Sequence, residues 1–198
     1  MSYIDLTALK AYLDITNSSD DTLLTDCITA AQKAIDNYAG RSFEAASDTT
    51  RYLSIADTLN APDAQGYRTL DIPFDLCAIT SVTNGDGTTI SANDYFTQPR
   101  NSTPYYALVI RRGASIAWTY EDDPEDAIAI VGRWAYSTTA PDDVKHACKR
   151  LAAYLFKQRD NMDDLDRPVA STDGMMLLPG GLPKDVKQLL SAYRKRVG

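Results

Sequence analysis

The spacing of the apolar residues changes twice along this chain, and these two changes restrict what it can fold into. Over residues 20–39 the apolar positions recur every three or four residues, as on the buried face of a helix. From about residue 50 to residue 137, short runs alternate between apolar and polar residues, which is typical of half-buried antiparallel strands. Helical spacing returns after Pro141. The sequence therefore predicts an α+β protein, a four-helix bundle with an inserted antiparallel module of β-sandwich or barrel-like form.

Each expected helix has a recognisable beginning or end. Asp5 can cap a helix over 5–14, and Gly40 stands where the helix over 20–39 should end. Pro141 with two acidic residues begins a third helix, and Pro183 begins a fourth that continues to Val197. Three of the helices have one apolar stripe each: Leu23, Leu24, Cys27, Ile28, Ala31, Ile35 and Tyr38; Val144, Cys148, Leu151, Ala152, Leu155 and Phe156; and Val186, Leu189, Leu190 and Tyr193. Because a single stripe needs a partner, these helices should pack on one another.

Turn residues separate the expected strands. Residues 84–87 read Asn-Gly-Asp-Gly, which tolerates the positive φ angles of a hairpin turn between strands over 79–83 and 88–91. Further strands should each place one set of side chains on one face: Tyr106, Leu108 and Ile110; Ile116, Trp118 and Tyr120; and Ile128, Ile130, Trp134 and Tyr136. This alternation favours a core role for the aromatic residues over the sugar-stacking surface of a hydrolase or carbohydrate-binding protein.

The order of these elements predicts a discontinuous domain. We expect residues 1–49 and 138–198 to form one helical domain, interrupted by a β module over residues 50–137. Residues 160–182 lie between the third and fourth helices and should form a loop, since they are rich in acidic residues, Gly and Pro.

Few residues in this sequence could support catalysis or hold a metal. A single histidine, His146, excludes any site with two His ligands, and the three scattered Cys residues form no C-x-x-C motif. His146 and Cys148 lie two residues apart on a helix, so they point in different directions. The turn at 84–87 and the acidic stretch 160–166 are expected to be a plain turn and a solvated loop rather than cation sites. The acidic stretch 121–126 is expected to be a charged turn between two strands. We therefore expect no enzyme activity, no catalytic residues, no metal and no cofactor.

The charge of the chain is unevenly distributed. The net charge is −7, but the first 140 residues hold 9 Lys+Arg against 19 Asp+Glu, whereas the remaining residues hold 11 against 8. The acidic majority argues against a protein that coats nucleic acid. No apolar run reaches the ~20 residues of a membrane span, and the N-terminus does not resemble a signal peptide. We therefore expect no membrane association, and the scattered cysteines favour a reducing compartment.

Two segments have more than one interpretation. The apolar run over residues 174–180 either folds back on its own core or forms a surface for a partner, because exposed Met and Leu side chains are otherwise a liability. The C-terminal helix, with its basic polar face, is either an ordinary last helix packed on the bundle or a docking helix that lies in a partner's groove.

Several short motifs occur in an order that is similar to one protein family. They are Leu6-Thr-x-Leu-Lys10-x-Tyr-Leu-x-Ile15, Asp20-Asp-x-Leu-Leu24, Ala30-Ala-x-x-x-Ile35-x-x-Tyr38-x-Gly40-Arg41, the hairpin over 79–87, Gly132-x-Trp-x-Tyr-Ser137, Pro141-x-Asp-Val-Lys145 and Leu182-Pro-Lys-Asp-Val-Lys-x-Leu-Leu190-x-x-Tyr-Arg194. In this order they resemble the head–tail connector, or head-completion adaptor, proteins of long-tailed phages. The resemblance implies a connector-type helical frame.

The resemblance also implies a non-enzymatic virion protein, assembled in the host bacterial cytoplasm, at the head–tail junction. Such proteins form a ring, typically of twelve subunits, beneath the portal. The ring extends the DNA channel, lets DNA pass without specific binding, and meets the next neck or tail component, a stopper or tail terminator. In the family the C-terminal segment reaches the portal. The implied portal-docking residues are therefore the apolar and basic ones of this segment: Lys184, Val186, Lys187, Leu189, Leu190, Tyr193, Arg194 and Arg196.

Two other functions remain open at this point. The chain could be another structural protein of the neck or tail, such as a stopper or a tail terminator. Less in keeping with the acidic composition, it could be a nucleic-acid-binding module that uses its basic C-terminus. Binding to random duplex DNA that weakens steeply with salt would favour the second of these.

Overall fold

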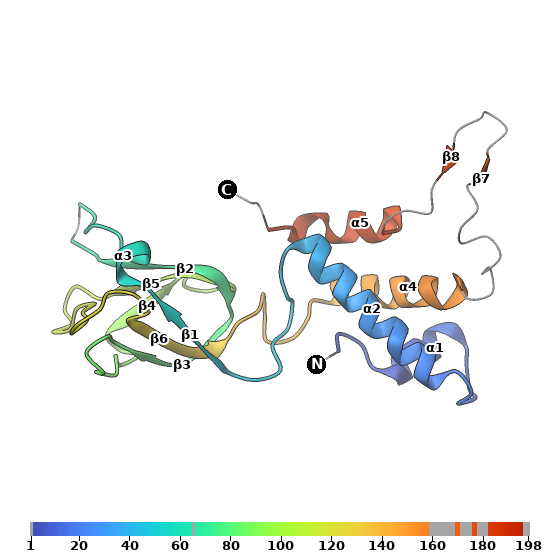
Figure 1. The fold of residues 1–198 in the computed structure, drawn as a ribbon, viewed down its shortest axis with the longest axis horizontal. Helices are drawn as coiled ribbons and strands as arrows, with labels where there is room; N and C mark the ends of the chain where they lie inside the picture. Colours follow the sequence, from blue (N-terminus) through green and yellow to red (C-terminus); the bar gives the residue numbers. More distant parts are fainter. Residues whose placement is uncertain (1, 65, 159–168, 171–175, 178–181, 196–198) are drawn as a thin grey trace. The chain divides into compact units, whose positions relative to one another are not determined.

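The chain divides into two units, which we describe separately. The computed structural model describes residues 2–64, 66–158, 169–170, 176–177 and 182–195 (Figure 1). One unit, the helical unit, holds Ser2–Arg41 and Ala140–Gly198, and the other, the β unit, holds Ser42–Thr139. Within the described residues the chain combines helices with antiparallel sheets, so the predicted α+β class is confirmed.

Helix α4 is the central element of the helical unit. It spans Asp142–Gln158 and packs against α1 (Leu6–Leu13), α2 (Asp21–Ala39) and α5 (Lys184–Leu190). The residues with the least exposure at these contacts are apolar: Leu9, Leu24, Ala31, Ile35, Val144, Ala147, Cys148, Ala152, Val186 and Leu190. The apolar stripes expected of the second, third and fourth helices thus meet in one core.

The predicted caps account for where α1 begins and where α2 ends. The Asp5 carboxylate accepts a hydrogen bond of 2.6 Å from the backbone N–H of Ala8, as an N-cap residue does. At the C-terminal end of α2, Gly40 adopts a φ of 68° and donates its N–H to the carbonyl of Asp36. Glycine takes this left-handed conformation without the steric cost that a Cβ would add.

The C-terminal helix is shorter than the sequence predicts. Helix α5 ends at Leu190 and continues as a 3₁₀ turn, η2 (Ser191–Tyr193), rather than as a helix to Val197. The backbone then extends at Arg194, and the N–H of Lys195 donates to the carbonyl of Ala39 at the end of α2. Between α4 and α5, in the region expected to be a loop, a short antiparallel pair forms between β7 (Val169–Ala170) and β8 (Met176–Leu177).

The β unit consists of two open three-stranded antiparallel sheets. One has the order β1–β6–β3, from Thr49–Leu53, Ile128–Arg133 and Ala78–Thr83. The other has the order β2–β5–β4, from Thr69–Leu76, Tyr105–Ile110 and Tyr95–Gln98. The two sheets share one core, built around Leu53, Leu70, Leu76, Val82, Leu108, Trp118, Ile128, Ile130 and Trp134. The described strands do not close into a barrel.

The strand predicted over residues 116–120 is wrong, because a side chain takes the hydrogen bonds that a neighbouring strand would make. Asn84, which is 2% exposed, donates its side-chain amide to the carbonyl of Ala117 at 2.7 Å and accepts from the N–H of Thr119 at 3.1 Å. Trp118 is buried as predicted, and its indole N–H donates a hydrogen bond to the carbonyl of Arg68. Tyr120, in contrast, is 46% exposed.

Three smaller differences from the prediction are local. The strand expected over 88–91 reduces to a single bridge between Thr83 and Thr89, although the turn at 84–87 forms as predicted, with the N–H of Gly87 on the carbonyl of Asn84. Tyr106 is 57% exposed rather than buried with Leu108, since it lies opposite the irregular stretch of β2. A short helix, α3 (Ile55–Thr58), was not predicted.

Candidate docking surface

Helix α5 is held in place by two buried residues of the predicted docking set. Val186 and Leu190 are both 0% exposed and belong to the core of the helical unit. An ion pair between Asp185 and Arg150 of α4 adds a second connection, and the Tyr193 hydroxyl lies 3.3 Å from the Asp143 carboxylate of α4. In the single chain, Val186 and Leu190 therefore pack α5 against α4, as the core residues of an ordinary last helix do.

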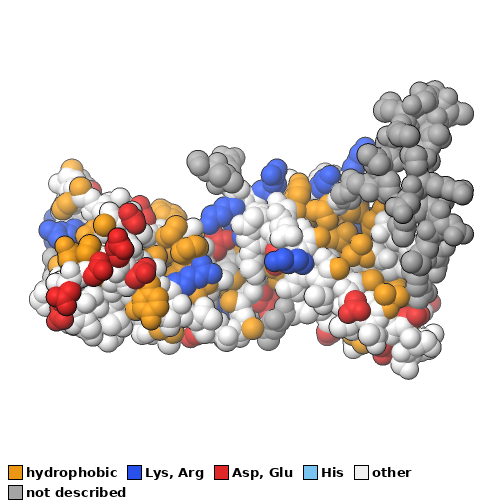
Figure 2. All heavy atoms as spheres, in the orientation of Figure 1, with side chains coloured by type: hydrophobic (Ala, Val, Ile, Leu, Met, Phe, Trp, Pro, Cys, Tyr) orange, Lys and Arg blue, Asp and Glu red, His pale blue; other side chains and the backbone are white. Residues whose placement is uncertain are grey.

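The other residues of the set lie on the outside of the helical unit or near its surface. Lys184, Lys187 and Arg194 are exposed, while Leu189 and Tyr193 are partly exposed. The Arg194 guanidinium lies over the Tyr38 ring of α2, 5.2 Å from its centroid, which limits the positions it can take. Arg196 lies outside the described residues. Figure 2 shows basic and hydrophobic side chains side by side around α5.

A groove runs along one side of α5. It has a volume of about 540 Å³ and is lined by His146, Arg150, Asp185, Gln188 and Leu189. Although burial acts to raise it, the pKa of the Asp185 carboxyl lies below its ordinary value, because the Val186 N–H and Arg150 stabilise the charged form. Asp185 is therefore ionised at neutral pH, so the groove carries one paired acid beside the exposed basic residues of α5.

A second groove, of about 400 Å³, is mainly apolar. It is lined by residues of α2 and α4 and by Leu182: Ala30, Ala34, Leu151, Tyr154, Leu155, Gln158 and Leu182. The apolar run over residues 174–180, for which two interpretations were open, falls almost entirely outside the described residues, apart from the backbone of β8.

Of the side chains that could have suggested catalysis, the cysteines are buried and the single histidine is exposed. Cys27, Cys77 and Cys148 are all buried free thiols. Burial, together with the negative charge of Asp36, raises the pKa of the Cys148 thiol to about 12, so it is not a nucleophile. His146 lies on the exposed side of α4. In the described residues no group of three or more His, Cys, Asp or Glu could hold a metal ion, and no helix there is both long and apolar enough to cross a membrane.

Comparison with known proteins places the whole arrangement in one family. The model of the head completion protein family matches residues 2–196, so it includes both units and the C-terminal segment. The chain belongs to the head completion protein family. The resemblance found in the sequence, and the expected class of function, a structural protein of the phage head–tail junction, are thereby confirmed.

A solved structure supports the fold of this head completion protein. A chain from the neck of an empty GTA particle, computed with C6 symmetry, is similar with a TM-score of 0.57 over 98% of this chain and 91% of that chain. The sequence identity is 17%, so the likeness concerns the fold alone. No curated protein matches this head completion protein significantly.

Proposed function

We propose that this head completion protein forms a ring of twelve copies beneath the portal, joins the head to the tail, and extends the DNA channel. The observation that carries the proposal is the family match over residues 2–196, since it covers the C-terminal segment as well as both units. The fold likeness to a neck chain supports the same position in the particle. In this role the protein is non-enzymatic, is assembled in the host bacterial cytoplasm, and ends in the virion.

Each part of the chain has a role in this proposal. Residues 1–49 and 138–198 form the connector-type helical bundle, and residues 50–137 form an inserted β module. The portal binds one face of the assembled ring, and a stopper or tail terminator binds another. The acidic majority of the chain suits a channel wall, because DNA must slide past without being held through its phosphates.

The proposed contact with the portal uses the exposed part of the C-terminal segment. Lys184, Lys187 and Arg194 supply positive charge, Leu189 and Tyr193 supply partly exposed apolar surface, and Arg196 extends the basic run. Val186 and Leu190 act indirectly, since their burial fixes the helix that presents the other residues. Charged residues at the edge of such an interface mainly set the rate and specificity of association.

The test uses charge reversal rather than deletion. Removal of residues 183–198 would also remove Val186 and Leu190 from the core and so destabilise the helical unit. The variant Lys184→Glu/Lys187→Glu is mixed with portal rings of the same phage, and bound protein is measured by co-sedimentation. We expect it to bind at least about tenfold more weakly than the wild-type chain at low salt. The control, Lys33→Glu/Lys157→Glu, changes the net charge equally at two other exposed lysines of the helical unit and should bind normally. Equal binding by both variants would contradict the proposed docking surface.

A further inference from the structure

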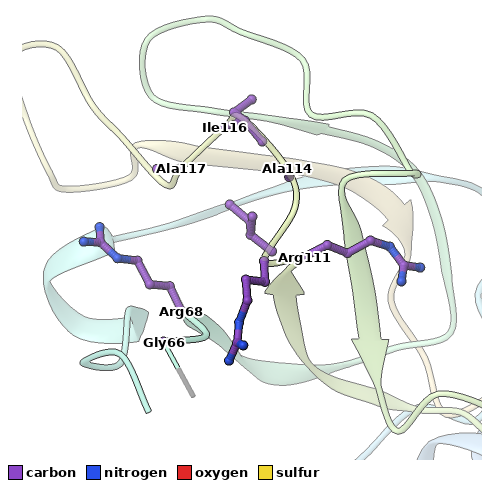
Figure 3. Close-up of a pocket in the computed structure, with 8 residues that line it drawn as sticks. Gly66, Arg68, Arg111, Ala114, Ile116 and Ala117 are labelled. Carbon is purple, nitrogen blue, oxygen red and sulfur yellow. The ribbon is translucent and has the colours of Figure 1, made fainter. Parts of the chain in front are cut away.

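A small hollow in the β unit is lined by three arginines. Its volume is about 170 Å³, and Figure 3 shows that its residues come from two segments, 66–68 and 110–117, on opposite sides of it. The lining is apolar between the arginines, and comprises Gly66, Arg68, Ile110, Arg111, Arg112, Ala114, Ile116 and Ala117. A hollow of this size holds one or two small side chains. Because arginines line it, a side chain with a negative charge is favoured there.

Aromatic rings beside the hollow contact two of its arginines, Arg111 and Arg112, and a third nearby, Arg100. Arg100 and Arg111 both lie over the Phe96 ring, with their guanidinium carbons 3.9 and 5.7 Å from its centroid. Tyr67 meets Phe96 edge to face at 6.1 Å, and Arg112 lies over Tyr67 at 5.2 Å. A guanidinium that stacks on a ring keeps its N–H edge available for a carboxylate. These contacts limit the positions of Arg100, Arg111 and Arg112 before any partner binds.

Three of the arginines in or beside the hollow form no ion pair within the described part of the chain. There, Arg68, Arg100 and Arg111 are exposed and have no carboxylate oxygen within 4.0 Å. The backbone that carries Arg111 is nevertheless well fixed, since its N–H donates to the carbonyl of Asp94 and its carbonyl accepts from the N–H of Ala114. Three exposed arginines without an ion-pair partner, two of which lie over the Phe96 ring, favour the binding of an anion here.

The same unit presents the opposite charge in a second place. Residues 121–126 include five exposed acids, and none of these forms an ion pair in the described residues. The loop is held by its backbone: the carbonyl of Pro124 accepts from the N–H of Ile55 at 2.9 Å, and the N–H of Asp126 donates to the Ser54 hydroxyl at 3.1 Å. The acids are thus displayed on a supported loop.

We propose that the arginine hollow of one copy receives the acidic loop, residues 121–126, of the next copy in the ring. This inference rests on the proposed ring and names one contact that closes it. A contact between two different surfaces of the same chain is heterologous, which is the kind of interface that generates cyclic rings. The charges on the two surfaces are complementary, and the backbone of each is held by hydrogen bonds in the single chain.

The composition of the β unit favours a second copy over DNA as the occupant. Residues 42–139 contain six Arg, no Lys and thirteen Asp or Glu, so the unit as a whole repels phosphate. DNA binding through the backbone requires several cations over an extended surface. An acidic protein loop needs only a few arginines, such as those that line the hollow.

The test compares charge reversals on each surface with their combination in the full-length chain. Self-association is measured by sedimentation velocity over a range of protein concentrations at low salt, alone and with portal rings. We expect Arg68→Glu/Arg111→Glu and Asp122→Lys/Asp123→Lys each to weaken self-association about tenfold or more. The chain that carries all four substitutions should regain it, because its complementary charges are exchanged. Lys33→Glu/Lys157→Glu serves as the control, and thermal unfolding confirms that each variant is folded.

Four results would overturn the inference. The first is self-association of the single-surface variants that equals that of the wild type. The second is failure of the four-substitution chain, folded as judged by its melting, to regain assembly. The third is a wild-type chain that stays monomeric, or forms only a dimer, in all conditions. The fourth is binding of the wild-type chain to DNA duplex of random sequence, if this binding weakens with salt and is abolished by Arg68→Glu/Arg111→Glu. In the first, second and fourth cases, a wild-type chain that still binds portal rings would leave the proposed function standing, and only this contact would be wrong. In the third case the proposed ring itself would be wrong.

Discussion

Arg150 of α4 and Asp185 in the first turn of α5 form an ion pair, which connects the segment proposed for portal docking to the central helix of the helical unit. The same segment is tied to α2 at its other end, where the N–H of Lys195 donates to the carbonyl of Ala39 at 2.8 Å. A docking helix that is ordered in the single chain loses less conformational entropy when it binds than a disordered tail would lose. Loss of this anchoring should therefore weaken portal binding without removing any exposed contact residue.

Truncation of the α5 anchor should lower the stability of the helical unit. Leu190 is 0% exposed, so Leu190→Ala removes buried methyl groups and leaves a cavity, at a cost of about 3 kcal/mol of unfolding free energy. Gln188→Ala, on the exposed side of the same helix, should change it by less than about 0.5 kcal/mol. Urea denaturation of both variants measures the difference. Equal stability of the two variants would mean that α5 does not pack on α4 as described.

Gly132 should not tolerate a side chain. A Cβ at this position in β6 would lie 2.2 Å from the carbonyl oxygen of Ala78 in β3, and a backbone atom cannot move aside without disturbing the strand pairing. We expect Gly132→Ala to destabilise the chain by about 3 kcal/mol. Gly113→Ala is the matched control, since a Cβ there meets no atom within 4 Å. The comparison can be made by thermal or urea unfolding.

The three cysteines should be unreactive while the chain is folded. All three thiols are buried, and burial raises the pKa of Cys148 to about 12, so almost no thiolate is present at pH 8. Ellman's reagent should therefore label none of them quickly in buffer and all three in denaturant. Rapid labelling of Cys148 in the folded chain would contradict the burial of its side chain on α4.

The stability of the helical unit should depend on the ionisation of Asp36. Burial raises the pKa of this half-buried carboxyl above its ordinary value, although the Tyr3 hydroxyl and Lys33 act in the other direction. Because the pKa is higher in the folded chain than in the unfolded chain, Asp36 favours folding at low pH, and this contribution is lost as pH rises through the folded pKa. Removal of the Tyr3 hydrogen bond should raise the pKa further. An NMR titration of the Asp36 carboxyl carbon in wild type and Tyr3→Phe measures this shift, and a lower pKa in the variant would be the opposite of the expected result.

Local chemistry was sufficient to predict α1, α2 and α4, with the cap that begins α1 and the cap that ends α2. Asp5 and Gly40 act as caps because one supplies an oxygen at the N-terminus and the other accepts a positive φ, and both properties depend on neighbours along the chain. The apolar stripes of α2 and α4 likewise follow from spacing alone. The alternation in β6 was readable for the same reason, since Ile128 and Ile130 are buried on one face.

Contacts between distant residues were not predictable in this way. Residues 116–120 alternate as a strand does, but Asn84 takes their backbone hydrogen bonds from 33 positions away. The arginine hollow joins residues 66–68 to residues 110–117, and nothing in either segment alone indicates that they meet. Burial of Val186 and Leu190 within the chain also depends on α4, and a stripe on α5 looks the same whether its partner lies in the same chain or in another protein.

The central claim, that this chain completes the head so that a tail can attach, is tested most directly with particles made in its absence. A phage that lacks the gene should produce DNA-filled heads without tails, seen by electron microscopy. Addition of the purified chain, with the remaining neck and tail components, should then restore tailed, infectious particles in vitro. Normal numbers of tailed particles from the phage that lacks the gene would contradict the account.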